Sequence, residues 1–223
     1  MVLDAQRPRL NYADPFTEEH EMFRKSVRNF VEKELNPHCE EWEAAGTWPA
    51  HEVLKKMGNL GFLGLNYSEE FGGANADVWF TVVLAEELGR CECAGVPMGI
   101  LVHTDMCTPA LAKYGSDDLR RKYLAPALRG EMVGCVAVTE PGTGSDVAGI
   151  ITRAEKDGDD YVINGAKMYI TNGTQADWVC LLARTEGGKG YRGMSLIIVP
   201  TDTPGFSVSR KLEKLGNRSS DTA

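Results

Sequence analysis

The spacing of apolar residues changes at Gly130, and this change constrains the fold more than any other feature of the sequence. Before Gly130, apolar residues recur at steps of three and four, which is the period of one face of an α-helix. After Gly130 they alternate with polar residues or form short continuous runs, which is typical of strands. Helices followed by strands predict an α+β fold. We therefore expect an N-terminal α-helical domain over residues 1–131 and a middle β domain over residues 132–223.

The most regular helix is predicted over residues 17–35. Thr17 can accept a backbone hydrogen bond at its start, Glu18 and Glu19 suit its first turn, and Pro37 prevents it from continuing. Further helices are expected at residues 49–58, 77–88 and 96–114, and a fifth is expected to begin at Ser116 and to be interrupted near Pro126.

Short apolar runs separated by turn residues predict the strands of the second half. Asp157-Gly158, Asn164-Gly165 and Asn172-Gly173 are turn signals, and Asn-Gly favours a two-residue hairpin. These features predict an antiparallel sheet of β-barrel-like or orthogonal form. The expected strands are residues 132–138, 151–155, 161–163, 166–170, 178–184, 195–199 and 206–209.

Composition narrows the possible classes of protein. A net charge of −8 and a pI of about 5.1 argue against a nucleic-acid-binding surface, which is usually basic. No apolar stretch approaches the roughly 20 residues that cross a bilayer. Residues 1–15 lack the apolar core of a signal peptide. We expect a soluble intracellular protein.

Six cysteines are spread over the chain without a C-x-x-C pair. Each lies in a segment expected to be helix or strand, which predicts buried free thiols in a reducing compartment. We expect no metal site, because the four histidines, at positions 20, 38, 51 and 103, do not approach the cysteines at ligand spacing. The cysteines are Cys39, Cys91, Cys93, Cys107, Cys135 and Cys180.

Two segments carry the residues on which a chemical function can be argued. The first, residues 137–149, is an apolar run that enters a loop with glycines, hydroxyls and acids, and the second is residues 167–173. A flavin needs backbone N–H groups near its pyrophosphate, hydrogen-bond donors at its ring edge and an aromatic or apolar surface against its face. The two segments contain all three. Composition alone favours a plain surface loop between strands, whereas the full string followed by the second segment at this spacing favours the flavin.

The two segments resemble the flavin-binding loops of the acyl-CoA dehydrogenase family, and the similarity extends from about residue 17 to residue 223. Members of this family have a helical domain, a middle β domain and a C-terminal four-helix domain. The resemblance implies FAD, oxidation of an acyl-CoA to the trans-2-enoyl-CoA, electron transfer to electron-transfer flavoprotein, and a homotetramer. It places the protein in the mitochondrial matrix of a eukaryote or the cytoplasm of a bacterium. Its residues are Phe71-Gly72-Gly73, Ala85-Glu86-Glu87-Leu88-Gly89, Val138-Thr139-Glu140-Pro141, Gly144-Ser145-Asp146, Asn164-Gly165, Lys167, Ile170-Thr171-Asn172-Gly173 and Ser220-Asp221-Thr222.

The resemblance also implies roles for individual residues. The Thr139 hydroxyl would lie near the flavin ring, Tyr169 would pack on its face, and Thr171 would bond near N5 and O4. Ser145 would contact both FAD and the acyl-CoA. Many relatives have Trp where this chain has Tyr169. The complete FAD-contacting set is Val136, Ala137, Val138, Thr139, Gly142, Gly144, Ser145, Tyr169, Ile170 and Thr171.

The family's catalytic base is a Glu of the C-terminal domain, and no residue of this chain matches it. We therefore expect the 223-residue chain to be a truncated form that does not dehydrogenate alone. The alternatives are an acyl-CoA oxidase or flavin monooxygenase of the same fold, and a non-catalytic partner subunit. By their position in the family, Met98, Ile100, Leu101, Val102 and Thr104 would border the acyl tail, although plain helix packing suits them at least equally. Cys93-Ala94-Gly95 and His103-Thr104 resemble long-chain members, which favours a medium, long or branched acyl chain.

Two further observations concern charged or titratable residues. His103 lies beside Asp105, but an isolated His on an apolar helix is usually a packing or hydrogen-bonding residue. Adjacent carboxylates at Glu86 and Glu87 diverge on a helix, so a solvated edge or a cap contact is expected there.

No G-x-G-x-x-G that follows a strand is present, so a nicotinamide site is not supported.

Overall fold

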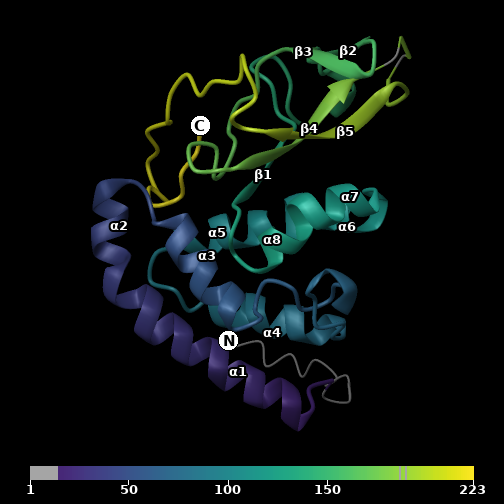
Figure 1. The fold of residues 1–223 in the computed structure, drawn as a ribbon. Helices are drawn as coiled ribbons and strands as arrows, with labels where there is room; N and C mark the ends of the chain where they lie inside the picture. Colours follow the sequence, from purple (N-terminus) through teal and green to yellow (C-terminus); the bar gives the residue numbers. More distant parts are fainter. Residues whose placement is uncertain (1–14, 186, 189) are drawn as a thin grey trace, which may run out of the picture.

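The computed structural model describes residues 15–185, 187–188 and 190–223. The prediction for residues 1–15 therefore lies outside the described residues except at its last position. Helices form the first half and a sheet the second, which confirms the predicted fold class. Figure 1 shows the sheet on one side of the helical layer. The division at residues 131 and 132 remains a prediction.

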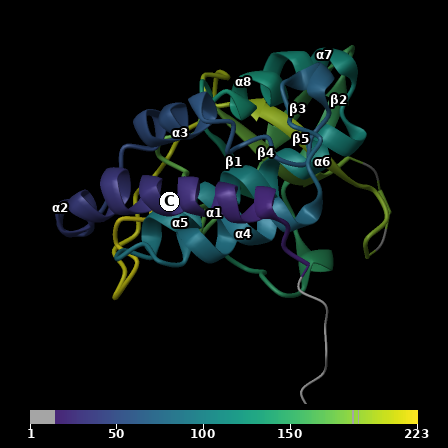
Figure 2. The same cartoon turned by 90° about the horizontal axis from the view of Figure 1, so that it is seen from below.

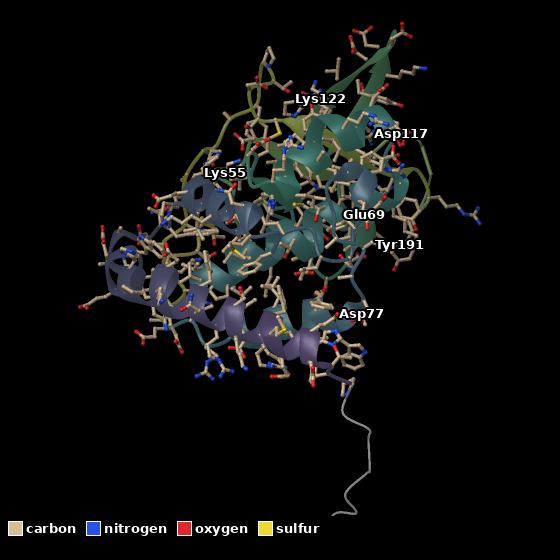
Figure 3. The ribbon with its side chains drawn as sticks, turned by 60° about the horizontal axis from the view of Figure 1, so that its bottom comes forward. Lys55, Glu69, Asp77, Asp117, Lys122 and Tyr191 are labelled. Atoms are coloured by element: carbon tan, nitrogen blue, oxygen red, sulfur yellow. The ribbon has the colours of Figure 1, made fainter. Side chains whose placement is uncertain are left out.

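The first helix begins and ends close to its predicted limits. α1 (Glu18–Phe30) continues through a π-helical turn at Val31–Leu35, and Thr17 accepts a hydrogen bond from the His20 backbone N–H at its start. The imidazole of His20 in turn accepts a hydrogen bond from the Thr17 backbone N–H, so two reciprocal hydrogen bonds cap the start of α1. α1 packs on α4 (Val78–Leu88). Asp77, labelled in Figure 3, precedes α4, and its Oδ1 lies 3.1 Å from Nε2 of His20.

The other predicted helices are present, and one was missed. α3 (Ala50–Asn59) matches its prediction, and α5 (Gly95–Leu101) runs through a π-helical turn, Val102–Cys107, into α6 (Thr108–Tyr114). Beyond Ser116, α7 (Asp117–Leu119) continues through Arg120–Leu124 into α8 (Ala125–Leu128), which contains Pro126. The unpredicted helix is α2, Cys39–Ala45.

The sheet is mixed rather than antiparallel. β1 (Gly134–Ala137) and β2 (Arg153–Asp157) pair parallel to β4 (Trp178–Arg184), whereas β3 (Asp160–Asn164) and β5 (Met194–Pro200) pair antiparallel to β2 and β4. Among the described residues no pairing closes the sheet into a barrel. The chain runs from β1 to β4 through a long connection, which allows the two strands to pair in parallel. The spacing of residues along the sequence does not show this direction.

Two predicted strands are absent. Residues 166–170 and 206–209 are irregular, so Asn164-Gly165 ends a strand without forming a hairpin. The turn predicted at Asp157-Gly158 is confirmed, and it closes a hairpin, because β2 and β3 pair across it and Gly158 has φ +62°. Within residues 166–170, the backbone N–H groups of Met168 and Ile170 bond the carbonyls of Thr139 and Ala223, which do not lie in strands.

Side-chain contacts fix the sheet to the helices. His103 is buried, accepts a hydrogen bond from Gly134 N at Nδ1 (3.1 Å) and reaches the Ala127 carbonyl with Nε2 (3.1 Å). It is thus a hydrogen-bonding residue, as predicted, and it links three elements. The C-terminal segment lies along α2, where the Glu43 carboxylate accepts hydrogen bonds from the amides of Arg218 (2.6 Å) and Ser219 (2.8 Å). Figure 2 shows the C-terminal segment beside α2 from below.

The described residues contain no helix that is long and apolar enough to span a membrane. All six cysteines are free; five are buried and Cys91 is half-buried.

Candidate functional site

The first of the two candidate segments is a tight turn that leaves β1. Glu140 and Thr143 exchange backbone hydrogen bonds of 2.9 and 3.2 Å, and the Thr143 hydroxyl bonds the Asp146 carbonyl at 2.5 Å. Gly142 and Gly144 are exposed, and a Cβ at either position would meet no protein atom within 4 Å. A ligand can therefore approach the backbone of this turn closely.

A buried carboxylate holds the turn in place. Glu140 accepts hydrogen bonds from Ile151 N (2.7 Å) and Thr152 N (2.9 Å), and the Lys167 ammonium lies 2.9 Å from it. Burial alone would raise the pKa of the Glu140 carboxyl, but these donors outweigh it and lower the pKa to about 2. Lys167 also donates to the Val138 carbonyl at 2.8 Å, so one side chain joins both segments.

The second segment is joined to the first by its backbone. Met168 N donates to the Thr139 carbonyl at 2.9 Å. Tyr169 has φ +63°, a left-handed conformation that is uncommon for a non-glycine residue, and 61% of its surface is exposed. This segment is not the strand expected over residues 166–170, so strand alternation does not place Tyr169 and Thr171 on one face.

The end of the chain supports the second segment from behind. Ile170 and Ala223 exchange backbone hydrogen bonds of 2.8 and 2.9 Å. Asn172 N bonds the Asp221 carbonyl at 2.7 Å, and the Asn172 side chain donates to the Gly99 carbonyl of α5 at 2.9 Å. Tyr169 is thus presented by a backbone that is anchored to both the sheet domain and the helices.

The structure brings the predicted residues into one region with unequal exposure. Ala137 and Ile170 are buried and pack with apolar residues of the sheet, and the backbone N–H and carbonyl of Ile170 are paired with Ala223. Val136, Val138, Thr139 and Thr171 are half-buried, whereas Gly142, Gly144, Ser145 and Tyr169 are exposed.

Glu140 and Lys167 have a structural role that sequence reasoning missed. They were part of the family resemblance but were given no function. The available signal was a Glu and a Lys in otherwise weakly charged segments, where buried charges require partners.

Beside the turn, an open cavity of about 550 Å³ is lined by Glu140, Pro141, Gly142, Thr143, Gly149, Ile151, Arg153, Glu155, Asn164, Gly165 and Ala166.

Comparison with known proteins shows the class to which this fold and site belong. The family described as acyl-CoA dehydrogenase, N-terminal domain, matches residues 17–131, and the one described as acyl-CoA dehydrogenase, middle domain, matches residues 135–223. The chain therefore belongs to the acyl-CoA dehydrogenase family.

Individual relatives agree with this assignment. The mitochondrial long-chain specific acyl-CoA dehydrogenase of Sus scrofa is 40% identical over 210 residues, which is 93% of this chain and 48% of that protein. The short-chain specific enzyme of Clostridium acetobutylicum is 39% identical, over 92% of this chain and 54% of its own length. The chain thus spans about half the length of the curated relatives it matches.

Solved structures share the fold. The acyl-CoA dehydrogenase of Geobacillus kaustophilus has a TM-score of 0.89 and 44% identity over 95% of this chain and 55% of its own. The acyl-CoA dehydrogenase of Bacillus anthracis, solved as a complex with FAD, has a TM-score of 0.86 and 32% identity over 93% of this chain and 35% of its own.

Proposed function

We propose that this chain provides the helical and middle parts of an FAD-dependent acyl-CoA dehydrogenase, which oxidises an acyl-CoA thioester to the trans-2-enoyl-CoA. The observation that carries the proposal is the hydrogen bond from Met168 N to the Thr139 carbonyl. It holds the glycine turn and the exposed Tyr169 ring together, and these are the two surfaces that a flavin requires. Family members are FAD-dependent oxidoreductases.

The residues present fit FAD. The open space at Gly142 and Gly144 admits a pyrophosphate to backbone N–H groups. Tyr169 offers an exposed aromatic surface, and the half-buried Thr139 and Thr171 supply hydroxyl donors to the ring edge. When bound, FAD supplies the acceptor for a hydride. Val136, Ala137, Val138 and Ile170 would line the site.

Substrate binding is proposed at Ser145, whose exposed position next to the turn allows contact with an acyl-CoA. The preference for medium, long or branched acyl chains has less support. Ile100, Val102 and Thr104 are buried and the half-buried Leu101 packs against the helical core, which favours helix packing. Met98 is 39% exposed and is left as the candidate contact to an acyl tail. The relatives include both long-chain and short-chain enzymes.

We propose that the 223-residue chain does not dehydrogenate by itself. The carboxylate held at the turn, Glu140, is buried and accepts hydrogen bonds from two amides and an ammonium. A pKa of about 2 makes it a poor proton acceptor at neutral pH. For the complete enzyme we propose electron transfer to electron-transfer flavoprotein, a homotetramer, and the mitochondrial matrix or bacterial cytoplasm.

Flavin binding to the purified chain tests the site. We expect FAD fluorescence to be quenched on titration, and Tyr169→Ala to weaken binding about 10-fold or more, since stacking on an aromatic ring contributes roughly 1–3 kcal/mol. Tyr191→Ala is the matched control, because Tyr191, labelled in Figure 3, is an exposed tyrosine (80%) outside both candidate segments. Equal effects of the two substitutions would contradict the assignment of Tyr169.

Turnover of the FAD-loaded chain tests the second part of the proposal. We expect no enoyl-CoA product from octanoyl-CoA or palmitoyl-CoA with electron-transfer flavoprotein as acceptor. Product formation would show that the chain contains its own base. Peroxide release in place of electron-transfer flavoprotein reduction would instead favour an oxidase.

A further inference from the structure

Three cysteine thiols meet at a place that the proposed flavin site does not use. Cys39 is the first residue of α2, and Cys91 and Cys93 lie in the loop between α4 and α5. The Cys39 Sγ lies 2.6 Å from that of Cys93 and 3.5 Å from that of Cys91, and the Cys91 and Cys93 sulfurs are 4.0 Å apart. Segments more than 50 positions apart in the sequence therefore converge on one point.

We propose that Cys39, Cys91 and Cys93 form a binding site for a thiophilic d10 metal ion, Zn²⁺ or Cu⁺, held by three thiolates. Thiolate ligands select these two ions over Mg²⁺, Ca²⁺ and Mn²⁺. Metal–sulfur bonds of about 2.3 Å in tetrahedral geometry place sulfurs roughly 3.8 Å apart. Two of the three separations are already near this value, and the Cys39–Cys93 pair would open by about 1 Å.

The surroundings suit entry and retention of an ion. Cys39 and Cys93 are 4% and 6% exposed and border the apolar core of the helical domain, whereas Cys91 is half-buried and gives access from solvent. In the part of the chain that the structure describes, no imidazole or carboxylate joins the three sulfurs as a fourth ligand. Three ligands suit trigonal Cu⁺, or Zn²⁺ whose fourth position is completed by water.

A Cys39–Cys93 disulfide is the competing use of this cluster, since the two sulfurs lie 2.6 Å apart. Such a bond would leave Cys91 outside it, whereas an ion engages all three thiols, whose sulfurs lie within 4.0 Å of one another. A metal ion displaces the thiol protons when it binds, and the titration below separates the two uses.

Sequence spacing did not reveal this site. The prediction of no metal rested on the separation of histidines from cysteines, and the structure leaves the histidines out of the cluster. What it adds is Cys39, which the fold carries to the Cys91-x-Cys93 pair. An ion here would connect the start of α2 to the loop before α5, and it should stabilise the folded chain by mass action.

The test is a titration of the full 223-residue chain, reduced and stripped of metal under argon. Zn²⁺ is added against a chromogenic chelator and Cu⁺ against bathocuproine disulfonate, so that the two arms identify the ion. We expect one equivalent to bind and the half-buried Cys91 thiol to become protected from a thiol reagent. Cys91→Ser should weaken binding about 100-fold or more, because even outer-shell partners contribute roughly 10- to 100-fold.

Controls separate coordination from a folding defect. Cys180→Ala removes a thiol of β4 outside the cluster and should leave stoichiometry and affinity unchanged. The half-buried Cys91 tolerates serine better than the buried pair, and circular dichroism checks the fold of the variant. Binding that survives the triple serine variant, tight binding by neither ion, or a Cys39–Cys93 disulfide that forms with metal present would each overturn the proposal.

Discussion

The ammonium of Lys167 lies 2.9 Å from the carboxylate of Glu140, with both side chains largely buried. The pair joins the two candidate flavin segments, because Glu140 starts the glycine turn and Lys167 immediately precedes Met168, whose amide bonds Thr139. The shape of the proposed flavin surface therefore depends on an ion pair that need not touch the ligand.

Glu140→Gln should destabilise the chain by about 3 kcal/mol, because it leaves the Lys167 ammonium buried without its counter-charge. Lys167→Met should cost less, since Glu140 keeps the amides of Ile151 and Thr152. Urea unfolding of each variant measures the difference. The control is Glu131→Gln, whose exposed ion pairs with Lys55 and Arg129 should change stability little. A smaller loss for Glu140→Gln than for Glu131→Gln would contradict this account.

Gly130→Ala should destabilise the chain by about 3 kcal/mol or more. Gly130 has φ +64°, and a Cβ there would stand 2.0 Å from the Leu54 carbonyl oxygen, so left-handed strain is added to a clash with backbone. Gly158→Ala is a matched control, because Gly158 has φ +62° but open space around it. That variant should lose about 1–2 kcal/mol from strain alone. Thermal unfolding compares the two, and equal losses would show that the contact with Leu54 does not matter.

The helices could be predicted from sequence because their signals are local. Thr17 at the start of α1 and Gly89 at the end of α4 lie where their residue types predict. α2 was missed because it is two turns long, begins directly after Pro37-His38, and is ended by Gly46 in a left-handed conformation. Seven residues give too little periodicity to detect.

The candidate site was predictable in its residues and less so in its geometry. Tyr169 lies next to the glycine turn, but not on a strand, because Met168 and Ile170 pair with Thr139 and Ala223 instead of a neighbouring strand. Alternating residues cannot reveal that a partner strand is missing. The approach of Cys39 to Cys93 likewise depends on tertiary packing.

Glu87→Gln should be more destabilising than Glu86→Gln. The two carboxylates were expected to form a solvated edge or a cap contact, but only Glu86 is exposed, and Glu87 is 2% exposed. Arg28 binds Glu87 through two hydrogen bonds of 2.7 and 2.8 Å, and this holds the pKa of the Glu87 carboxyl below its usual range. We expect a loss of about 2 kcal/mol for Glu87→Gln, since its partners are partly solvated. Denaturant midpoints of the two variants check the order, and a reversed order would contradict it.

His103 should make the chain less stable as the pH falls from about 6.5 to about 4. Burial lowers the pKa of the imidazole from 6.5 to about 4, outweighing the opposing effect of the Ala127 carbonyl. Its stabilising contribution is thus complete above the unfolded pKa. In the window between the two values the unfolded chain binds a proton that the folded chain does not, so stability declines by up to about 3 kcal/mol.

His103→Gln separates this effect from other acid titrations. The Gln amide can donate to the Ala127 carbonyl and accept from Gly134 N, and it does not titrate. We expect the variant to lose the decline in the free energy of unfolding between pH 6.5 and 4. It should keep the steeper decline below pH 4.5, where Glu140 gains a proton on unfolding and its stabilising contribution disappears as the pH approaches 2. Urea unfolding from pH 7 to pH 3 measures both limbs. An unchanged upper limb in the variant would show that the buried imidazole is not its source.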